Sequence, residues 1–232
     1  MTRRLAIVGM GKMGRAVADL AGAHDFEVTA RLGHAEVTSG LTRAMLNGAD
    51  VAVEFTVPEA APGNVRAIVA AGCPVVVGTT GWHERLDDVS RDVNASNGAL
   101  LAAANFSLGV NIFEQVLAQA AKLFAAAPGF DAHMIETHHA AKKDAPSGTA
   151  ITLAKAAAAV GGGEIPITSV RVGAVPGIHE VIFDAQFEQV RLQHVARDRR
   201  VFAEGALVAA AWLIGRRGVF TMKDVLDSSS HA

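Results

Sequence analysis

Residues 136–150 read ETHHAAKKDAPSGTA and gather titratable and anion-binding groups into one short segment. His138 and His139 are adjacent, and the intrinsic pKa of imidazole suits a proton donor near neutral pH. Lys142 and Lys143 are cations that can hold a carboxylate, although we expect Lys143 to be an ordinary surface charge. Basic side chains beside a proton donor predict a site for a small dianionic substrate.

The second half of this segment, DAPSGTA, predicts a loop that runs into the N-terminus of a helix. Asp144 or Ser147 can cap that helix, and Ser147, Gly148 and Thr149 would present N–H groups and hydroxyls to an anion. We expect no metal here, because no carboxylate or cysteine spacing around the two histidines completes a metal site.

A second candidate site lies near the N-terminus, where GMGKMG places Gly9, Gly11 and Gly14 in the G-x-G-x-x-G spacing. The pattern follows the apolar run RLAIVG and opens a helical stretch, which is the context that gives it meaning. One glycine makes the tight turn, the next admits a pyrophosphate and the third lets helix and strand pack closely. We therefore predict a dinucleotide site, with a ligand-free turn as the alternative.

The expected ribose-binding residue of this site is missing from its usual place. Such sites carry an acidic residue about 20 positions on, at the end of the second strand. Gly33 and His34 fall there, with Arg31 two residues earlier. Because no carboxylate repels a 2′-phosphate, we expect NADPH to serve at least as well as NADH. Glu36 fills the acidic role if the strand ends elsewhere.

The first half of the chain alternates strand-like and helical runs. Apolar runs predict strands over residues 4–9, 27–32, 49–56, 74–80 and 98–106, with helices between most of them. This alternation predicts a parallel sheet that is buried on both faces and binds ligands at the carboxyl ends of its strands. The fold expected for this half is a Rossmann-type α/β domain.

The second half follows a different pattern. It predicts a long helix that ends before Pro128, a strand into the histidines and an alanine-rich helix. Residues 168–205 alternate apolar and polar side chains, which predicts a meander of antiparallel strands with one exposed or partner-covered face. A last helix then returns to the first domain and a tail follows. We expect a dinucleotide-binding domain of residues 1–106 and 204–232, and an α+β domain of residues 107–203 with a mostly antiparallel open sheet.

Composition excludes several classes of protein. The 232 residues carry a formal net charge of −2, so nothing favours binding to nucleic acid or to an anionic membrane surface. Cys73 is the single cysteine, which excludes an intramolecular disulfide and suits a buried, inert thiol. The apolar run after the first arginines is too short for a secretory signal, and we expect a cytoplasmic protein.

The histidine segment resembles the signature E-x-H-H-x-x-K-x-D-x-P-S-G-T-A of the dihydrodipicolinate reductase family. VGMGKMGR, EFTVPEA, VVVGTTGW and AAANFSLGVNIF resemble the family's earlier segments, in the family's order. VRVGAVPGIHEVIF, QHVARDRRVFAEGALVAAAWL and GVFTMKDVLD resemble its later ones. The likeness covers nearly the whole chain. It departs in the short segment HAEVTSGLTRAMLNGADV and in the missing acidic residue, which affects the choice of cofactor.

The resemblance implies a reaction: reduction of 4-hydroxy-tetrahydrodipicolinate (dihydrodipicolinate) to tetrahydrodipicolinate by NADPH or NADH in the diaminopimelate route to lysine. It also implies a homotetramer formed through an extended sheet. By motif, His138 is the general acid, and Lys142 holds a carboxylate and assists proton transfer. His139, Gly148 and Thr149 bind the substrate's carboxylates, with Ser147 nearby.

The cofactor residues expected from the glycine pattern and the family's segments lie at strand ends. They are Val8, Gly9, Met10, Gly11, Lys12, Met13, Gly14, Gly33, His34, Gly78, Thr79, Thr80, Ala103, Ala104, Asn105 and Phe106. Arg199 is a weaker candidate near the substrate. Domain closure is expected, with hinges near residues 105–106 and 204–205.

Two rival functions remain. Another nicotinamide enzyme, such as an amino-acid dehydrogenase, would share GMGKMG without needing the His-His-Lys-Ser-Gly-Thr constellation. A redox-sensing regulator would need a DNA-binding or partner module.

Overall fold

The computed structural model describes residues 2–229, which divide into two compact units. One unit comprises the residues up to Leu108 together with those from Arg200 onward, and the other is Gly109–Arg199. The second connection falls at Arg200 because a helix, α7 (Arg200–Leu213), begins there. Gly205, expected at a hinge, lies inside α7, and a Cβ atom there would come within 1.7 Å of the Phe106 carbonyl oxygen.

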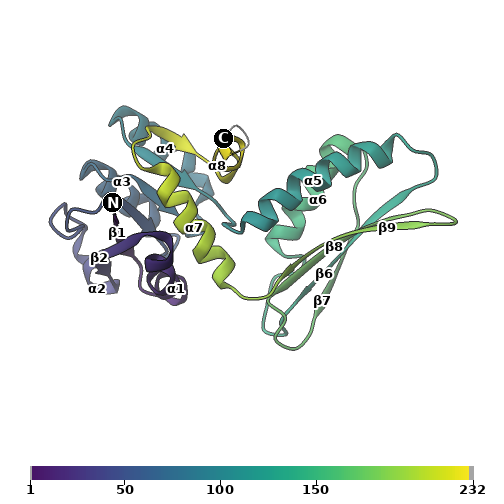
Figure 1. Cartoon of the computed structure of the whole chain (residues 1–232), viewed down its shortest axis with the longest axis horizontal. Coiled ribbons are helices and arrows are strands. Elements are labelled where there is room, and N and C mark those ends of the chain that lie inside the picture. Colours follow the sequence, from purple (N-terminus) through teal and green to yellow (C-terminus); the bar gives the residue numbers. More distant parts are fainter. Residues whose placement is uncertain (1, 230–232) are drawn as a thin grey trace. The chain divides into compact units, whose positions relative to one another are not determined.

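The first unit is built on a six-stranded parallel sheet with the strand order β10-β5-β4-β3-β1-β2. Of these strands, β1 and β2 are labelled in Figure 1. The short central strands of this sheet consist almost wholly of buried valine, leucine and alanine, as a sheet covered on both faces requires. The strands are β1 (Arg3–Val8), β2 (Phe26–Leu32), β3 (Val51–Glu54), β4 (Val75–Val77), β5 (Ala99–Ala102) and β10 (Gly218–Phe220).

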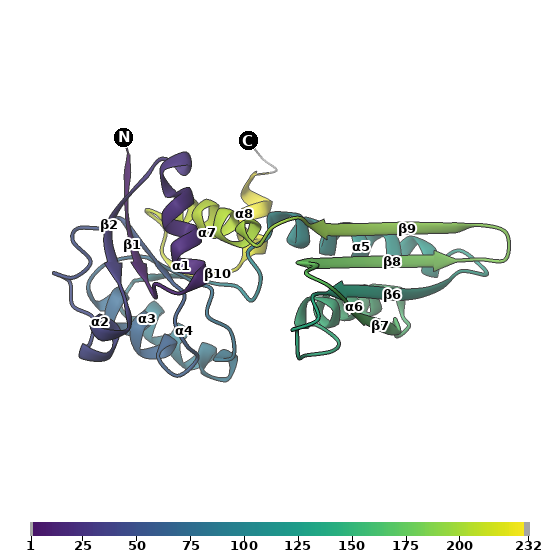
Figure 2. The ribbon, with the colours of Figure 1, turned by 90° about the horizontal axis from the view of Figure 1, so that it is seen from below.

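Helices cover both faces of this sheet (Figure 2). One layer contains α1 (Lys12–Leu20) and α7, whose side chains pack with the buried residues Leu5 and Ile7 of β1. The other layer contains α3 (Ala61–Ala70) and α4 (Leu86–Ala95), which cover Ala6 and Val8. Two helical turns, η1 (Ala21–His24) and η2 (His83–Arg85), and the helices α2 (His34–Ser39) and α8 (Met222–Ser229) complete the unit.

The strand pairings confirm the predicted parallel sheet and add a sixth strand to it. The C-terminal segment expected to be a tail contains β10, which pairs with β5, and then α8. Three residues are too few to show a strand period in the sequence.

Cys73 is buried, as predicted. Burial, followed by the charge of Asp50, raises the pKa of its thiol to about 12.

The second unit is a four-stranded sheet in the order β7-β6-β8-β9, with two helices packed on one face. The antiparallel pairs β6–β8 and β8–β9 confirm most of the predicted sheet. The elements are α5 (Leu108–Ala125), β6 (Asp131–His138), α6 (Gly148–Gly161), β7 (Ile167–Arg171), β8 (Gly177–Asp184) and β9 (Gln189–Ala196).

The predicted meander of residues 168–205 is wrong at both ends. At its start, β7 pairs parallel to β6, because α6 carries the chain back across the sheet between them. At its end, RVFAEG belongs to α7 rather than to a strand. Only β8 and β9 form the expected antiparallel hairpin, and its strands are eight residues long.

The two-residue period of β6 decides which side chains face the helices. Met134, Glu136 and His138 are buried, whereas the residues between them are less so. Near α5 the helix-facing side is an apolar core that includes Phe113, Met134 and Phe183. Its composition changes to acidic and imidazole side chains at the carboxyl end of β6. Within residues 2–229, no helix is long and apolar enough to cross a membrane.

Candidate active site

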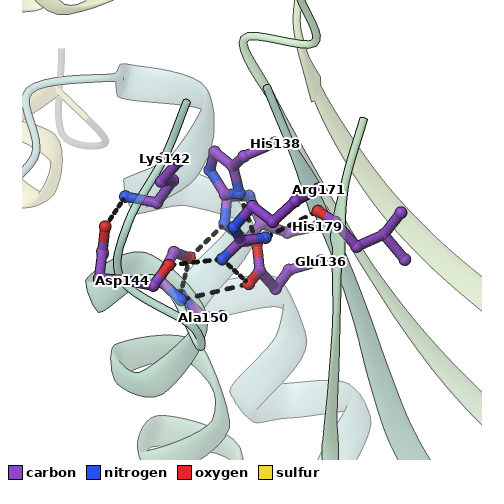
Figure 3. A network of polar contacts seen from close by, with 9 residues as sticks. Glu136, His138, Lys142, Asp144, Ala150, Arg171 and His179 are labelled. Carbon is purple, nitrogen blue, oxygen red and sulfur yellow. Dashed lines mark hydrogen bonds and ion pairs between the residues drawn. The ribbon is translucent and has the colours of Figure 1, made fainter. Parts of the chain in front are cut away.

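The polar end of the second unit brings Glu136, His138, Ser147, Arg171 and His179 into one connected network (Figure 3). Strand register explains the meeting. Arg171 of β7 lies beside His138, and His179 of β8 lies opposite Glu136, all on the helix-facing side. The start of α6 contributes Ser147. Residues from β7, β8 and the start of α6 thus meet at the carboxyl end of β6.

Glu136 is the centre of this network and has no exposed surface. Its Oε2 contacts Nδ1 of His138, and its Oε1 accepts hydrogen bonds from Arg171 Nη2 at 2.6 Å and from the Ser147 N–H at 3.3 Å. Burial acts to raise the pKa of this carboxyl. The hydrogen bonds from Arg171, Ser169 and His138 outweigh burial and hold the pKa at about 2, so the group is an anion.

His138 ends β6 and is 8% exposed. Burial lowers its pKa, the neighbouring Glu136 raises it, and the positive charges of Lys142 and Arg171 lower it further. The net direction is downward, so in the unliganded protein the imidazole loses its proton below its ordinary pH range. His179 packs edge-on against it, with 5.2 Å between ring centroids.

Ser147 caps α6, as the sequence allowed, and Asp144 does not. The Ser147 Oγ accepts a hydrogen bond from the Ala150 N–H at 3.1 Å and lies 3.3 Å from Nε2 of His179. Burial, followed by the charges of His138 and His194, lowers the pKa of His179 to about 4. Gly148 and Thr149 form the first turn of this 14-residue helix, whose N-terminus carries partial positive charge.

Lys142 lies in the loop between β6 and α6, where its Nζ pairs with Asp144 Oδ1 at 2.8 Å. This pairing lowers the pKa of Asp144. Lys143 is exposed, as expected of a surface charge, and His139 is half-buried. Arg199, the weaker candidate, is exposed beyond the end of β9. Lys142 is thus held by one exposed carboxylate, whereas Arg171 is bonded to Glu136 and to two backbone carbonyl oxygens.

In the first unit, the three glycines of the predicted dinucleotide motif meet three different constraints. Gly9 has a φ of +97°, and a Cβ atom there would lie 2.2 Å from the Phe55 carbonyl oxygen. A Cβ atom on Gly14 would lie 2.0 Å from the Gly9 carbonyl oxygen. Gly11, the N-cap of α1, has open space instead. The loop therefore has a tight turn, an open backbone and a close helix–strand contact, as a pyrophosphate cradle requires.

A cavity of about 750 Å³ lies beside this loop. Its lining includes the predicted cofactor residues Gly9, Met10, Gly11, Gly33 and His34. The rest of the lining comes from α2 and its following turn, and from the end of β3 with α3: Val37, Thr38, Gly40, Leu41, Phe55, Thr56, Val57, Glu59, Ala60, Gly63, Asn64 and Ala67.

The other predicted cofactor residues lie at or just after the carboxyl ends of the same strands, or in the first turn of α1, and do not line this cavity. Val8 is paired with Glu54, Glu54 with Val77, and Val77 with Ala102, so the strand ends are level. Lys12, Met13 and Gly14 form the first turn of α1. Gly78, Thr79 and Thr80 follow β4, and Ala103, Ala104, Asn105 and Phe106 follow β5.

Thr79 faces inward, toward a buried carboxylate. Its Oγ1 donates to Glu54 Oε2 at 2.6 Å and accepts from the Thr56 N–H at 2.8 Å. Asn64 Nδ2 donates to the other oxygen of Glu54 at 3.1 Å. Burial raises the pKa of Glu54 against these hydrogen bonds. This network ties the end of β4 to two cavity residues, Thr56 and Asn64.

Comparison with known proteins matches both units to one family. Residues 3–106 match the family model described as dihydrodipicolinate reductase, N-terminus, and residues 109–226 match the model of its C-terminus. The chain belongs to the dihydrodipicolinate reductase family. The predicted likeness to this family is confirmed.

Curated relatives match the chain along its whole length. The 4-hydroxy-tetrahydrodipicolinate reductase of Rhodopseudomonas palustris is 37% identical over 97% of this chain and 98% of its own length. That of Christiangramia forsetii is 34% identical over 96% of this chain and 97% of its own.

A solved dihydrodipicolinate reductase from Paenisporosarcina sp. TG-14, bound to dipicolinate, aligns with a TM-score of 0.79. It covers 95% of this chain and 98% of that one at 22% identity, which shows a shared fold. A diaminopimelate dehydrogenase of C. glutamicum shares the fold at a TM-score of 0.52 and 14% identity, covering 95% of this chain and 93% of that one.

Three residues of the network around Glu136 were missed from the sequence. Glu136 opens the family signature, but without knowing the strand's phase no pattern showed that it faces His138. Arg171 and His179 lie 35 and 32 residues from their partners, Glu136 and Ser147. Only the pairing of β7 and β8 with β6 brings them together. Thr56 and Asn64 were missed in the first unit, although EFTVPEA marks a strand end.

Proposed function

We propose that this protein reduces 4-hydroxy-tetrahydrodipicolinate to tetrahydrodipicolinate, the reaction named for its full-length relatives, with a nicotinamide cofactor. One observation carries the proposal: a buried imidazole lies in the same network as the capped N-terminus of α6, with Lys142 in the loop between them. A proton donor beside two anion-binding groups suits a ring that carries two carboxylates and must receive a proton.

Lys142 and the start of α6 bind the substrate's carboxylates in this proposal. Lys142 is held by Asp144, whose side chain is 57% exposed, and such surface pairs are worth only about 0–1 kcal/mol. A substrate carboxylate can therefore replace Asp144 at small cost. The backbone of Gly148 and Thr149, with Ser147 and His139 nearby, receives the second carboxylate. The relative bound to dipicolinate, itself a pyridine dicarboxylate, supports this choice of ligand class.

His138 supplies the proton. In the free protein its pKa is lowered, first by burial and then by the cations around it, against the influence of Glu136. A bound dianion offsets the charges of Lys142 and Arg171, so binding raises the pKa and loads the imidazole with a proton. Substrate binding thus prepares the acid that the reaction consumes.

The first unit fits a dinucleotide. The open backbone at Gly11, the first turn of α1 and the cavity beside them suit its phosphates and adenosine half. The segments Gly78–Thr80 and Ala103–Phe106, at the same sheet edge, are proposed to hold the nicotinamide half. When bound, the cofactor supplies the hydride.

We propose that NADPH serves at least as well as NADH. His34 and Thr38 line the cavity, and among the described residues that line it the only acidic side chain is Glu59. Glu36, the alternative ribose ligand, accepts a hydrogen bond from the Gly33 N–H at 2.8 Å. Steady-state Michaelis constants for the two cofactors test this point, and a strong preference for NADH would contradict it.

We further propose a homotetramer of cytoplasmic chains that close during turnover. Val170 and Val195 lie on the sheet face away from the helices and are 37% and 47% exposed. A second copy that covered this face would bury them. Light scattering should give four times the chain mass of 24.0 kDa.

Because substrate and cofactor residues lie in different units, we propose closure about the connections at residues 108–109 and 199–200.

The activity is tested by NADPH oxidation in a mixture where dihydrodipicolinate synthase makes the substrate from pyruvate and aspartate semialdehyde. We expect oxidation that depends on both the synthase and this protein. No oxidation, with synthase turnover confirmed separately, would leave the proposed reaction without support.

A further inference from the structure

The buried carboxylate of Glu136 touches both halves of the proposed site, and the proposed reaction gives it no role. Through one oxygen it contacts the proton donor, His138. Through the other it accepts the Ser147 N–H, at the start of the anion-binding helix, and the Arg171 guanidinium. Arg171 also donates to the Asp144 carbonyl oxygen at 2.6 Å, which ties the loop between β6 and α6 to the same network.

These contacts determine the protonation of His138. An ionised carboxylate can only accept hydrogen bonds, so the Nδ1 atom of His138 must carry the proton between them. Its Nε2 atom is then the one available to substrate. Beside it lies Gly177, where a Cβ atom would stand 3.2 Å from Nε2. The absence of a side chain at position 177 keeps that nitrogen accessible.

The same carboxylate also locates the helix start. Glu136 holds the backbone of Ser147, while the Ser147 hydroxyl accepts the Ala150 N–H and contacts His179. Ser147 is 2% exposed and His179 is 4% exposed, so neither has room to move without disturbing the other. Displacement of Glu136 would therefore remove the side chain that contacts both His138 and the start of α6, and the two could then move separately.

We propose that Glu136 is a positioning residue that selects the Nδ1–H tautomer of His138 and holds this imidazole in register with the first turn of α6. Arg171 donates to Oε1 of Glu136, which orients the carboxylate and leaves Oε2 as the acceptor for His138. This role rests on the proposed reductase function, but the tautomer is a property of the free protein and is measurable without substrate.

Glu136→Gln tests the role with little change of shape. Arg171 and Ser147 both donate, so they retain the amide oxygen, and the amide NH₂ is left facing Nδ1 of His138. The imidazole must then move its proton to Nε2. We expect ¹⁵N spectra of histidine-labelled protein to show this change of tautomer, with the signal assigned by its loss in His138→Gln. The groups that face His138 during a pH titration are Glu136, Lys142, Arg171 and His179.

Kinetics provide the second readout. We expect Glu136→Gln to lower kcat by roughly 10²-fold, with a smaller change in KM. The amide NH₂ cannot accept a hydrogen bond from Nδ1–H, so it disfavours the doubly protonated imidazolium that must donate the proton. Asp92→Asn is the matched control: it replaces an exposed carboxylate that pairs with Arg66 at 2.6 Å in the other unit. The control should leave both the tautomer and kcat unchanged.

An unaltered His138 tautomer in folded Glu136→Gln would overturn the proposal, even if the enzyme were active. If that variant does not fold, Glu136→Asp takes its place, since it keeps the anion but withdraws it by one methylene. Wild-type kcat in Glu136→Asp would equally overturn the proposal. A change of tautomer in a protein whose wild type lacks reductase activity would support the positioning role and refute the proposed reaction instead.

Discussion

At the scale of single residues, the chemistry depends on how three charges surround one imidazole. Burial is the main cause that lowers the pKa of His138, Glu136 raises it, and the charges of Lys142 and Arg171 lower it further. Because the last two groups are cations, an anionic ligand weakens their effect. Lys142, the proposed ligand of a substrate carboxylate, therefore also lowers the pKa of the acid until the substrate arrives.

This balance predicts two different pH profiles. The acid must be protonated, so activity is lost as pH rises through its pKa. For kcat/KM, which reports the free enzyme, the descending limb should lie below the ordinary histidine pKa of about 6.5, since the pKa of His138 is lowered there. For kcat, which reports the complex, the limb should lie at higher pH. Steady-state rates across pH test this order, and coincident limbs would contradict it.

His138→Gln should remove the proton donor while leaving the cofactor site in the other unit intact. We expect turnover to fall by roughly 10²-fold or more, with little change in cofactor affinity measured by fluorescence titration. Turnover at the wild-type rate would show that another group donates the proton.

At the scale of elements, alternation along strands and caps on helices place these residues. The period of β6 sends Glu136 and His138 to the same side, and the Ser147 cap begins α6 at the height of that pair. In the first unit, β3 and β4 end in a similar buried arrangement around Glu54. Each site thus rests on a fully buried carboxylate that joins neighbouring segments.

Thr79→Val tests the second of these arrangements. The substitution removes two hydrogen bonds from this buried network, one accepted from the Thr56 N–H and one donated to Glu54, which should lower the free energy of unfolding by about 1–3 kcal/mol. Thr29→Val is the control, because the Thr29 hydroxyl is buried in β2 with no hydrogen-bond partner in the described structure. It should be neutral or stabilising in urea denaturation. An equal loss of unfolding free energy in Thr79→Val and Thr29→Val would show that the hydrogen bonds around Glu54 do not stabilise the fold.

At the scale of the whole molecule, the sequence was sufficient for the parallel sheet and the glycine loop, and it limited the cap of α6 to Asp144 or Ser147. These features depend on short-range patterns: apolar runs, glycine spacing and a serine before a helix. It was insufficient for Arg171 and His179, whose partners are set by strand pairing, and for the parallel placement of β7, which the alternating pattern of residues 168–205 could not distinguish from a meander.

The two adjacent lysines of residues 136–150, of which only Lys142 belongs to the signature, provide the most direct test of the whole account. NADPH oxidation, coupled to dihydrodipicolinate synthase, is measured for the wild type, Lys142→Ala and Lys143→Ala in parallel. Lys142 pairs with Asp144 in the loop between β6 and α6, whereas Lys143 is exposed. Only the substitution of Lys142 should therefore raise the substrate KM and lower kcat. Equal losses for the two lysines, or an effect of Lys142→Ala confined to the KM for NADPH, would contradict the assignment of this cluster to the substrate.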